Sequence, residues 1–409
     1  MSMSVDVHLL SGKRASVDVE ADASVESLRR RAQTALMTPG RGRLLNSCGE
    51  VLDGAQTIKQ AKLKSGDVLA LHVNQVQIKA MPRESFRPAF AALLGDGSVI
   101  TWGDADCGGD STAVQEQLRD VQQIQEQLRD VQQIQASRVA FAAILGDGSV
   151  VTWGDAEYGG DCTAVQDQLR DVQQIQASER AFAAILGDAS VVTWGVGDYG
   201  GDSSAVQEQL RDVQQIQASV GAFSAIRSDG SVVAWGSADY GGDSSAVQEP
   251  LREVQQIQAS AHAFAAIRSD GSVVTWGDAD CGGDSSAVQK QLRGANQIQS
   301  SHAAFAAILS DKSVVTWGHA DYGGDCTAVQ DQLRDVQQIQ ASHSAFAAIL
   351  GDGSVVAWGH ARFGGDCSAV QEQLRDVQQI QACEHAVAAI LGDGSVVAWG
   401  HASAADPSF

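Results

Sequence analysis

The sequence predicts a mainly β protein, in which eight repeated β-units follow a small α+β domain. A Trp-Gly pair recurs eight times, with a spacing of 41 residues from Trp153 onward. Before each pair, two short runs rich in β-branched and aromatic residues flank a turn that usually contains Asp-Gly. The 409 residues include 42 glycines and only 5 prolines, which is typical of a β protein with glycine turns.

One repeat runs from residue 172 to residue 212 and reads VQQIQASERAFAAILGDASVVTWGVGDYGGDSSAVQEQLRD. The segments AFAAIL and SVVTW predict a β-hairpin, in whose turn Gly accepts a positive φ. Ala189 and Lys312 replace this Gly in two repeats, and each is expected to cost on the order of 1 kcal/mol if the turn is kept. The preceding segment QIQAS alternates and predicts a third strand.

One tryptophan per hairpin is expected to fill the space between neighbouring units, since aromatic rings bury large areas. The eight are Trp102, Trp153, Trp194, Trp235, Trp276, Trp317, Trp358 and Trp399. The first two are 51 residues apart because the segment EQLRDVQQIQ occurs twice within residues 116–135. The extra copy is expected to form an inserted loop.

The segment AVQEQLRDV leaves an alternative fold open. Val206, Leu210 and Val213 have the spacing i, i+4, i+7, which is typical of a helix. A horseshoe solenoid with one strand and one helix per unit would satisfy this spacing. Each unit contains too many strand-like residues for a one-strand repeat, which favours three strands.

The repeat carries a family resemblance. Its pattern V-x-x-I-x-A-S, a short apolar strand, D-G-x-V-x-x-W-G and then an aromatic-Gly pair resembles the regulator-of-chromosome-condensation (RCC1-like) repeat, in particular that of propellers with short three-stranded blades. Over residues 76–401 the resemblance implies a β-propeller of seven or eight small blades, followed by a tail at 402–409. The sequence departs from the family where Ser137 replaces Gly and where Phe replaces the following His, with Val387 in the last repeat.

Residues 1–75 predict a small α+β domain in the order strand, strand, helix, strand, strand. Ser24 is expected to cap the helix, whose buried face is predicted to comprise Val25, Leu28, Ala32 and Ala35.

The segments LLSGK, RLL, LDG and LALHV of this domain follow one another as in ubiquitin, so the domain resembles a ubiquitin-like (β-grasp) fold. The resemblance implies a receptor-binding patch at Leu10, Leu45 and His72. No di-glycine follows the last strand, so we expect a built-in domain and not a conjugated tag. The domain either docks to a partner or merely starts the chain and packs on the edge of the propeller.

Most of the formal net charge of −22 comes from the repeats. Residues 1–75 carry 10 Lys/Arg and 8 Asp/Glu, whereas residues 76–409 carry 18 and 42. This acidity repels phosphate backbones, so no nucleic acid partner is expected. It serves solubility or attracts a basic protein partner.

No apolar run approaches the roughly 20 residues of a membrane span, and the first residues lack the pattern of a secretory signal. We therefore expect no membrane partner. Five of the seven cysteines are scattered replacements of repeat Tyr or Ser residues, which indicates reduced thiols. A cytoplasmic or nuclear location is expected.

The sequence contains no pattern typical of catalysis, metal binding or a cofactor. It has no G-x-S-x-G elbow, phosphate loop, C-x-x-C pair or H-x-x-x-H pair. We expect no enzyme activity, metal or cofactor. A Gly-Gly-Asp turn recurs in seven repeats, and its Asp is expected to hydrogen-bond to its own turn; a rim of carboxylates that holds cations or a basic partner is the alternative. These residues are Asp110, Asp161, Asp202, Asp243, Asp284, Asp325 and Asp366.

The candidate partner-binding residues of the repeats are those at which the repeats differ. One variable set follows the Ser of QIQAS, and the other follows Trp-Gly. Loops beside strands present recognition residues on rigid scaffolds, although neutral drift at exposed turns is an alternative. The candidates of the first set are Arg138, Glu179, Arg180, His262, His302, His343 and His385. Those of the second set are Asp106, Glu157, Asp198, Asp239, Asp280, Asp321 and Arg362.

Three functions are open at this point. The first is a non-catalytic protein-interaction scaffold or adaptor, with a link to the ubiquitin system through residues 1–75. The second is a regulator that acts in trans on a small GTPase, by guanine-nucleotide exchange, or on a ubiquitin ligase. The third is a structural repeat without a dedicated partner. A recognition surface requires that the two variable sets lie on one face.

Overall fold

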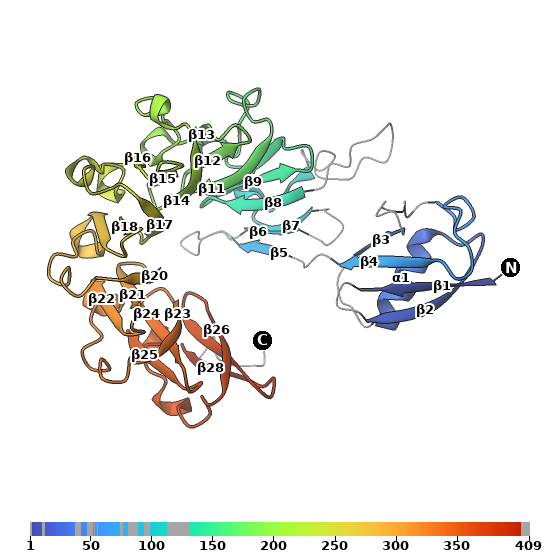
Figure 1. Cartoon of the computed structure of the whole chain (residues 1–409). Helices are drawn as coiled ribbons and strands as arrows, with labels where there is room; N and C mark the ends of the chain where they lie inside the picture. The colour runs from blue at the N-terminus through green and yellow to red at the C-terminus, as the bar shows by residue number, and fades with distance from the viewer. Residues whose placement is uncertain are drawn as a thin grey trace. The chain divides into compact units, whose positions relative to one another are not determined.

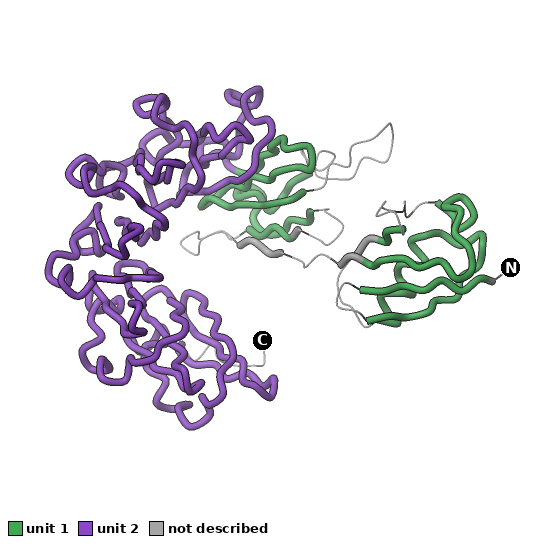
Figure 2. The backbone as a smooth tube through the Cα atoms, in the orientation of Figure 1, with its two compact units in different colours: residues 1–154 green, residues 155–409 purple. Residues whose placement is uncertain are grey.

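The computed structural model of the protein describes residues 2–9, 13–36, 42–46, 52, 54, 56–73, 77–80, 89–93, 99–112 and 131–401. Its strands form one four-stranded sheet and eight three-stranded sheets (Figure 1). The chain divides into two compact units, residues 1–154 and 155–409 (Figure 2). No helix of the described residues is long and apolar enough to cross a membrane.

The four-stranded sheet has the order β2-β1-β4-β3, and only its central pair, β1 and β4, is parallel. One helix, α1 (Val25–Leu36), shares a hydrophobic core with the sheet. The strands are β1 (Ser2–His8), β2 (Arg14–Glu20), β3 (Gly42–Leu45) and β4 (Val68–Val73). The order strand, strand, helix, strand, strand is therefore confirmed.

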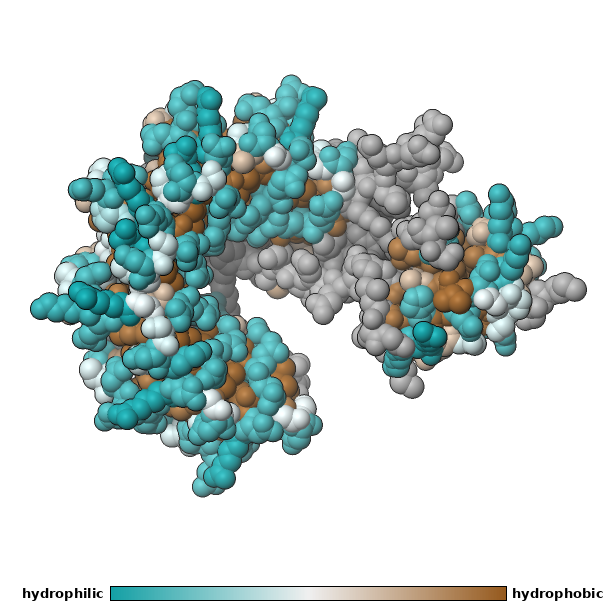
Figure 3. Space-filling view, in the orientation of Figure 1, coloured by the Kyte–Doolittle hydropathy of each residue, from teal (hydrophilic) through white to brown (hydrophobic). Residues whose placement is uncertain are grey.

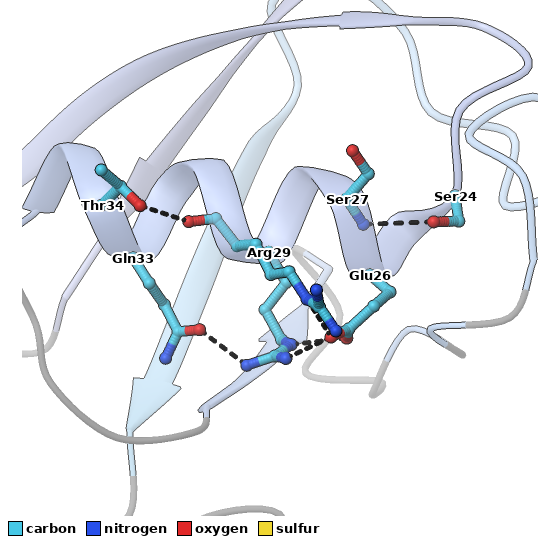
Figure 4. A network of polar contacts seen from close by, with 7 residues as sticks. Ser24, Glu26, Ser27, Arg29, Gln33 and Thr34 are labelled. Atoms are coloured by element: carbon cyan, nitrogen blue, oxygen red, sulfur yellow. Dashed lines mark hydrogen bonds and ion pairs between the residues drawn. The ribbon is translucent and has the colours of Figure 1, made fainter.

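Ser24 caps α1 as predicted, because its Oγ accepts a hydrogen bond from the N–H of Ser27 over 3.2 Å (Figure 4). In the first turn Glu26 accepts hydrogen bonds from Arg29 and Arg30. Arg29 also donates to the side chain of Gln33 over 2.6 Å. An acidic residue in the first turn stabilises the positive end of the helix dipole.

The buried face of α1 corrects one sequence expectation. Val25, Leu28 and Ala32 are buried as predicted, but the fourth buried residue is Leu36, and Ala35 is exposed. Three turns of a helix contain about 11 residues, so position 36 lies over position 25 on the same face. The larger Leu36 side chain fills this place in the core.

Each repeat forms one antiparallel three-stranded sheet, so the described residues contain eight small blades. This confirms the mainly β, propeller-type fold class. In the first unit the strands are β5 (Gln77–Ala80), β6 (Ala89–Leu93), β7 (Val99–Gly103), β8 (Val131–Ala136), β9 (Ala140–Leu145) and β10 (Val150–Gly154).

In the second unit the strands are β11 (Val172–Ala177), β12 (Ala181–Leu186), β13 (Val191–Gly195), β14 (Val213–Ala218), β15 (Ala222–Arg227), β16 (Val232–Gly236), β17 (Val254–Ala259), β18 (Ala263–Arg268), β19 (Val273–Gly277), β20 (Ala295–Ser300), β21 (Ala304–Leu309), β22 (Val314–Gly318), β23 (Val336–Ala341), β24 (Ala345–Leu350), β25 (Val355–Gly359), β26 (Val377–Ala382), β27 (Ala386–Leu391) and β28 (Val396–Gly400). The segment VQQIQA thus supplies the predicted third strand.

The horseshoe alternative is wrong. Residues 131–401 contain no α-helix, and the segment AVQEQLRD forms turns with short 3-10 helices such as η5 (Gln207–Gln209). Its helix-like spacing has another cause. Leu210 is buried in the core between two sheets, and Val213 already begins the next strand.

The hairpin turn persists in the two repeats that lack its glycine. Ala189 and Lys312 adopt φ values of 63° and 66°, the left-handed conformation that glycine occupies in the other hairpin turns that the structure describes. The strain expected from the sequence is therefore present at both positions. A left-handed non-glycine residue costs on the order of 1 kcal/mol.

The tryptophans link neighbouring sheets in the second unit. Trp194 stacks on Phe182 of its own sheet, with ring centroids 5.3 Å apart. Its Nε1 donates a hydrogen bond of 3.0 Å to the carbonyl of Gly159, which lies in the loop before that sheet. The same bond recurs from Trp235, Trp276, Trp317, Trp358 and Trp399. Packing between neighbouring repeats is confirmed for these tryptophans.

Trp102 is the exception, because its side chain is 41% exposed. It belongs to the first repeat, and no earlier repeat supplies a loop to cover it. At the other end of the chain, Ile390 and Val396 of the last repeat are exposed, whereas their counterparts Ile349 and Val355 are buried against the next sheet. Figure 3 shows hydrophilic residues over much of the visible surface of the repeats, with hydrophobic residues between them.

Candidate functional site

The two variable sets lie side by side in the second unit. In six repeats, the residue two positions after Trp donates a main-chain hydrogen bond to the carbonyl of the residue two positions after the Ser of QIQAS, or after Cys383 in the last repeat. The bonds measure 2.9–3.0 Å. They run from Val196 to Arg180, Ser237 to Gly221, Asp278 to His262, His319 to Ala303, His360 to Ser344, and His401 to His385. Both sets therefore occupy one face.

A second series of main-chain bonds connects successive repeats along this face. The residue directly after the Ser donates its N–H to the carbonyl of the equivalent residue in the next repeat. The series runs from Glu179 to Val220, Ala261, His302, His343 and Glu384, with distances of 2.9, 2.9, 2.9, 2.9 and 3.1 Å. We call these six residues the ladder. It fixes the spacing of the variable side chains.

Short 3-10 helices beside the ladder supply one side chain each. Five end in a half-buried aromatic ring, and η8 ends in Cys281. In the five helices that end in Tyr199, Tyr240, Cys281, Tyr322 and Phe363, the carbonyl of the terminal residue accepts a hydrogen bond from a repeat Ser, for example from Ser178 to Tyr199 over 2.9 Å. The helices are η3 (Ala156–Tyr158), η4 (Gly197–Tyr199), η6 (Ala238–Tyr240), η8 (Ala279–Cys281), η9 (Ala320–Tyr322) and η10 (Ala361–Phe363).

These rings and the variable side chains form a continuous row, which we call the band. At one end the guanidinium carbon of Arg180 lies 5.2 Å from the ring centroid of Tyr158 and 4.4 Å from that of Tyr199. The Tyr199 and Tyr240 rings follow at 5.8 Å. His262 lies 4.5 Å from Tyr240. This part is the tyrosine segment.

The band continues as a histidine segment. His302 is 6.4 Å from His262 and stacks on His343 at 4.5 Å. Tyr322 lies 5.6 Å from both His302 and His343. Phe363 and then His385 follow, at centroid distances of 5.5 and 4.9 Å. His401 completes the row, 6.2 Å from His385.

An exposed charged residue precedes the last residue of each 3-10 helix. The charge is negative in five consecutive repeats, at Glu157, Asp198, Asp239, Asp280 and Asp321. It is positive in the sixth, where the Nη2 of Arg362 lies 3.2 Å from the Nε2 of His401. The side chains predicted from the second variable set thus flank the band.

The Gly-Gly-Asp carboxylates accept hydrogen bonds within their own turns, as the sequence predicts. Asp202 accepts a hydrogen bond of 2.9 Å from the N–H of Ser204, and the other six accept the equivalent bond. These bonds hold the pKa of the Asp202 carboxyl below its usual value. Among the described residues, no group of three or more His, Cys, Asp or Glu is placed to hold a metal.

The remaining candidates belong to the first compact unit, residues 1–154, and are described by themselves. Arg138 is half-buried in the turn between β8 and β9. Asp106 lies in the 3-10 helix η1 (Ala105–Cys107), and its N–H donates to Asp104. Leu45 pairs with Ala70 across β3 and β4, and His72 lies opposite Arg43 in the same pair of strands. Leu10 is outside the described residues.

Sequence reasoning missed the aromatic residues of the band. The candidate binding residues were chosen as positions at which the repeats differ, so a position that most repeats share was not among them. The residues missed in this way are Tyr158, Tyr199, Tyr240, Tyr322 and Phe363. The available signal was an aromatic-Gly pair one loop away from the variable positions. The replacements by Cys107 and Cys281 also marked this position as one where repeats differ.

No protein-family model matches the sequence. No curated protein matches it either. Among solved structures, the chain is similar to the computationally designed Ika8 protein (14% identity, 80% of this chain, 97% of that chain, TM-score 0.38). It is similar to Prp20p from Saccharomyces cerevisiae (16%, 64%, 77%, 0.38), whose structure is described with its binding to Gsp1p and histones. It is also similar to a ubiquitin from Caldiarchaeum subterraneum (19%, 18%, 96%, 0.17).

Prp20 is yeast RCC1, so the similar solved structures include a protein of the family that the repeat resembles. All three TM-scores are below 0.5, and such similarity assigns no function to this chain. The strand order of the eight sheets carries the fold class.

Proposed function

We propose that this protein is a non-catalytic interaction scaffold that binds a protein partner along the band. The observation that carries the proposal is that the two variable sets and five aromatic rings join in one row. Tyr and Arg are enriched at interface positions that dominate binding energy. Repeats that differ mainly along this row would differ in what they recognise.

The rigidity of the row supports the same function. The ladder and the bonds between the two variable sets fix the main chain from which the variable side chains project. A surface that is ordered before binding loses less conformational entropy when the partner docks. The acidic side chains beside the tyrosine segment favour a basic protein and disfavour nucleic acid.

The remaining parts of the proposal rest on the sequence. A ubiquitin-like role of residues 1–75 would connect the scaffold to the ubiquitin system. Reduced thiols and an acidic body suit a cytoplasmic or nuclear setting. The absence of any catalytic motif in the sequence supports a role without enzyme activity or cofactor.

Affinity capture with the full-length chain tests the scaffold. The test variant carries His343→Ala, Phe363→Ala and His385→Ala in the band. The control carries Glu208→Ala, Glu249→Ala and Glu372→Ala, three exposed residues of the long loops. Partners retained by the wild type and the control should be lost from the band variant, with equal circular dichroism spectra. Equal recovery by all three proteins would refute binding along the band.

Nucleotide-release and ubiquitin-transfer assays separate this proposal from the trans-acting regulator. The scaffold predicts that added protein leaves both rates unchanged. An accelerated rate that is lost in the band variant would replace the scaffold with a regulator that uses the same surface.

A further inference from the structure

The tyrosine segment already holds one cation of its own chain. The guanidinium of Arg180 lies within about 6 Å of two aromatic centroids, the range of a cation–π interaction. Its Nε is buried and has no hydrogen-bond partner among the described residues. Among the described residues, this guanidinium contacts these two rings. The geometry shows that successive rings of the band accept a guanidinium.

One repeat further along, the same position has no side chain. Gly221 is the counterpart of Arg180, and a Cβ built on it would approach the Tyr240 ring to 2.7 Å. Tyr199 and Tyr240 pack together here, with their rings tilted by 38°, and both side chains are half-buried. The ring pair is thus partly exposed: Arg180 covers one side of Tyr199, the His262 ring lies 4.5 Å from that of Tyr240, and position 221 adds no cation of its own.

Two acidic residues flank the tyrosines of this ring pair in the sequence. Asp198 and Asp239 are exposed and directly precede the two tyrosines. Neither Asp198 nor Asp239 forms an ion pair among the described residues, whereas Glu208 and Asp229 of the same two repeats pair with Arg211 and Arg227. Burial, followed by Tyr199 and Glu179, raises the pKa of Tyr240. The Arg180 guanidinium acts on the same pKa in the opposite direction.

We infer that Tyr199, Tyr240, Asp198 and Asp239 form a subsite for an arginine side chain of a basic protein segment. The inference rests on the proposed function and names the chemistry of the partner. The guanidinium would stack on the exposed part of the ring pair and donate hydrogen bonds to a flanking carboxylate. Arginine suits this site better than lysine because its planar group both stacks on aromatic rings and binds carboxylates in a bidentate manner.

Titration of the full-length protein with labelled alternating Gly-Arg, Gly-Lys and Gly-citrulline peptides tests the subsite. Citrulline keeps the planar shape but removes the charge. The arginine peptide should bind at least about threefold more tightly than the lysine peptide, and the citrulline peptide should show no saturable binding. Equal affinities for arginine and lysine would overturn the inference and leave only non-specific charge attraction.

Variants locate the binding. Combined Tyr199→Leu and Tyr240→Leu should weaken the arginine peptide about tenfold, and combined Asp198→Asn and Asp239→Asn should weaken it comparably. Tyr199→Phe with Tyr240→Phe keeps both rings and should retain binding, which separates a lost subsite from a lost fold. The charge-matched control is Glu249→Gln with Glu372→Gln, outside the band. Unchanged affinity in the Asn pair would place the peptide elsewhere.

The two proposals fail differently. If captured partners depend on the histidine segment while no variant of the subsite changes arginine-peptide binding, the scaffold stands and the arginine subsite is wrong. If the band variant retains every partner, the scaffold itself is wrong.

Discussion

The indole Nε1 of Trp194 donates a hydrogen bond to the carbonyl of Gly159. A side chain of one sheet thus supplies the hydrogen-bond donor for a carbonyl in the loop that precedes that sheet. The Gly159 residue ends a 3-10 helix in the left-handed conformation, with φ of 91°. A Cβ at this position would lie 2.6 Å from the Phe182 ring, which packs on the glycine. Glycine is therefore required here both by its φ and by the close approach.

Trp194→Phe should destabilise the protein by about 1–3 kcal/mol. The substitution keeps an aromatic ring but leaves the buried Gly159 carbonyl without its donor, and an unsatisfied buried group costs this amount. Urea unfolding followed by circular dichroism measures the change. Trp102→Phe is the matched control, and its effect should be much smaller because Trp102 is 41% exposed. Equal losses from both variants would contradict a specific role for the bond.

Ala189→Gly and Lys312→Gly should each stabilise the protein, by about 0.5–1 kcal/mol. Both residues adopt a positive φ that strains a side chain and suits glycine, and relief of this strain exceeds the added entropy of the unfolded chain. Thermal unfolding of the single variants and of the pair checks the prediction. Ala184→Gly, in the middle of β12, serves as the control and should be destabilising. A loss of stability in both turn variants would refute the strain.

Acid should weaken the repeats below about pH 4. Hydrogen bonds from Ser190 lower the pKa of the Asp188 carboxyl, and equivalent bonds act in the other hairpin and Gly-Gly-Asp turns. A pKa lowered by folding contributes stability that is present above the unfolded value of about 3.9 and is lost as the pH falls through the folded value. Melting temperatures measured between pH 7 and pH 2.5 should stay level and then fall.

Asp188→Asn isolates one such turn, because its amide oxygen still accepts the hydrogen bond but carries no charge. Its melting temperature should depend less on pH in the acid range than that of the wild type. A variant with the same acid dependence as the wild type would show that the turn carboxylates do not cause the loss.

Most described cysteines should react slowly with thiol reagents. Burial, together with Asp278 and Asp280, raises the pKa of Cys281 to about 11, and burial raises the pKa values of Cys326 and Cys367. Only the thiolate is nucleophilic, so few of these groups react at neutral pH. Cys383 is exposed and should be the first of the described cysteines to be alkylated. Mass mapping after a short iodoacetamide pulse checks the order, and early labelling of Cys326 would contradict it.

The sequence predicts the local structure well and the surface only in part. Repetition and the alternation of AFAAIL and VVTW specify three strands, because these residues must bury two sheet faces. The exposure of Trp102 could not be predicted from the repeat pattern. Burial of this tryptophan requires a preceding repeat, and the first repeat has none. The sequence pattern of four apolar residues did not show whether Ala35 or Leu36 completes the buried face of the helix. Helix geometry decides this, because position 36 lies over position 25.

Only the variable positions of the band could be predicted from the sequence. The variable positions were visible as differences between copies, and their union on one face depends on main-chain bonds such as that from Val196 to Arg180. These hydrogen bonds join residues that are 16 positions apart in the sequence, so the local residue pattern does not predict them. The shared tyrosines were hidden for the opposite reason, because their constancy resembled that of core residues.

The ladder makes the number of repeats a measure of length. Each 41-residue copy adds one rung and one ring position at a fixed interval. Gain or loss of a whole copy would therefore extend or shorten the contact row by one step and leave the other steps in register. The number of repeats therefore sets the length of partner segment that the row can contact. Duplication of one repeat alone would change that length.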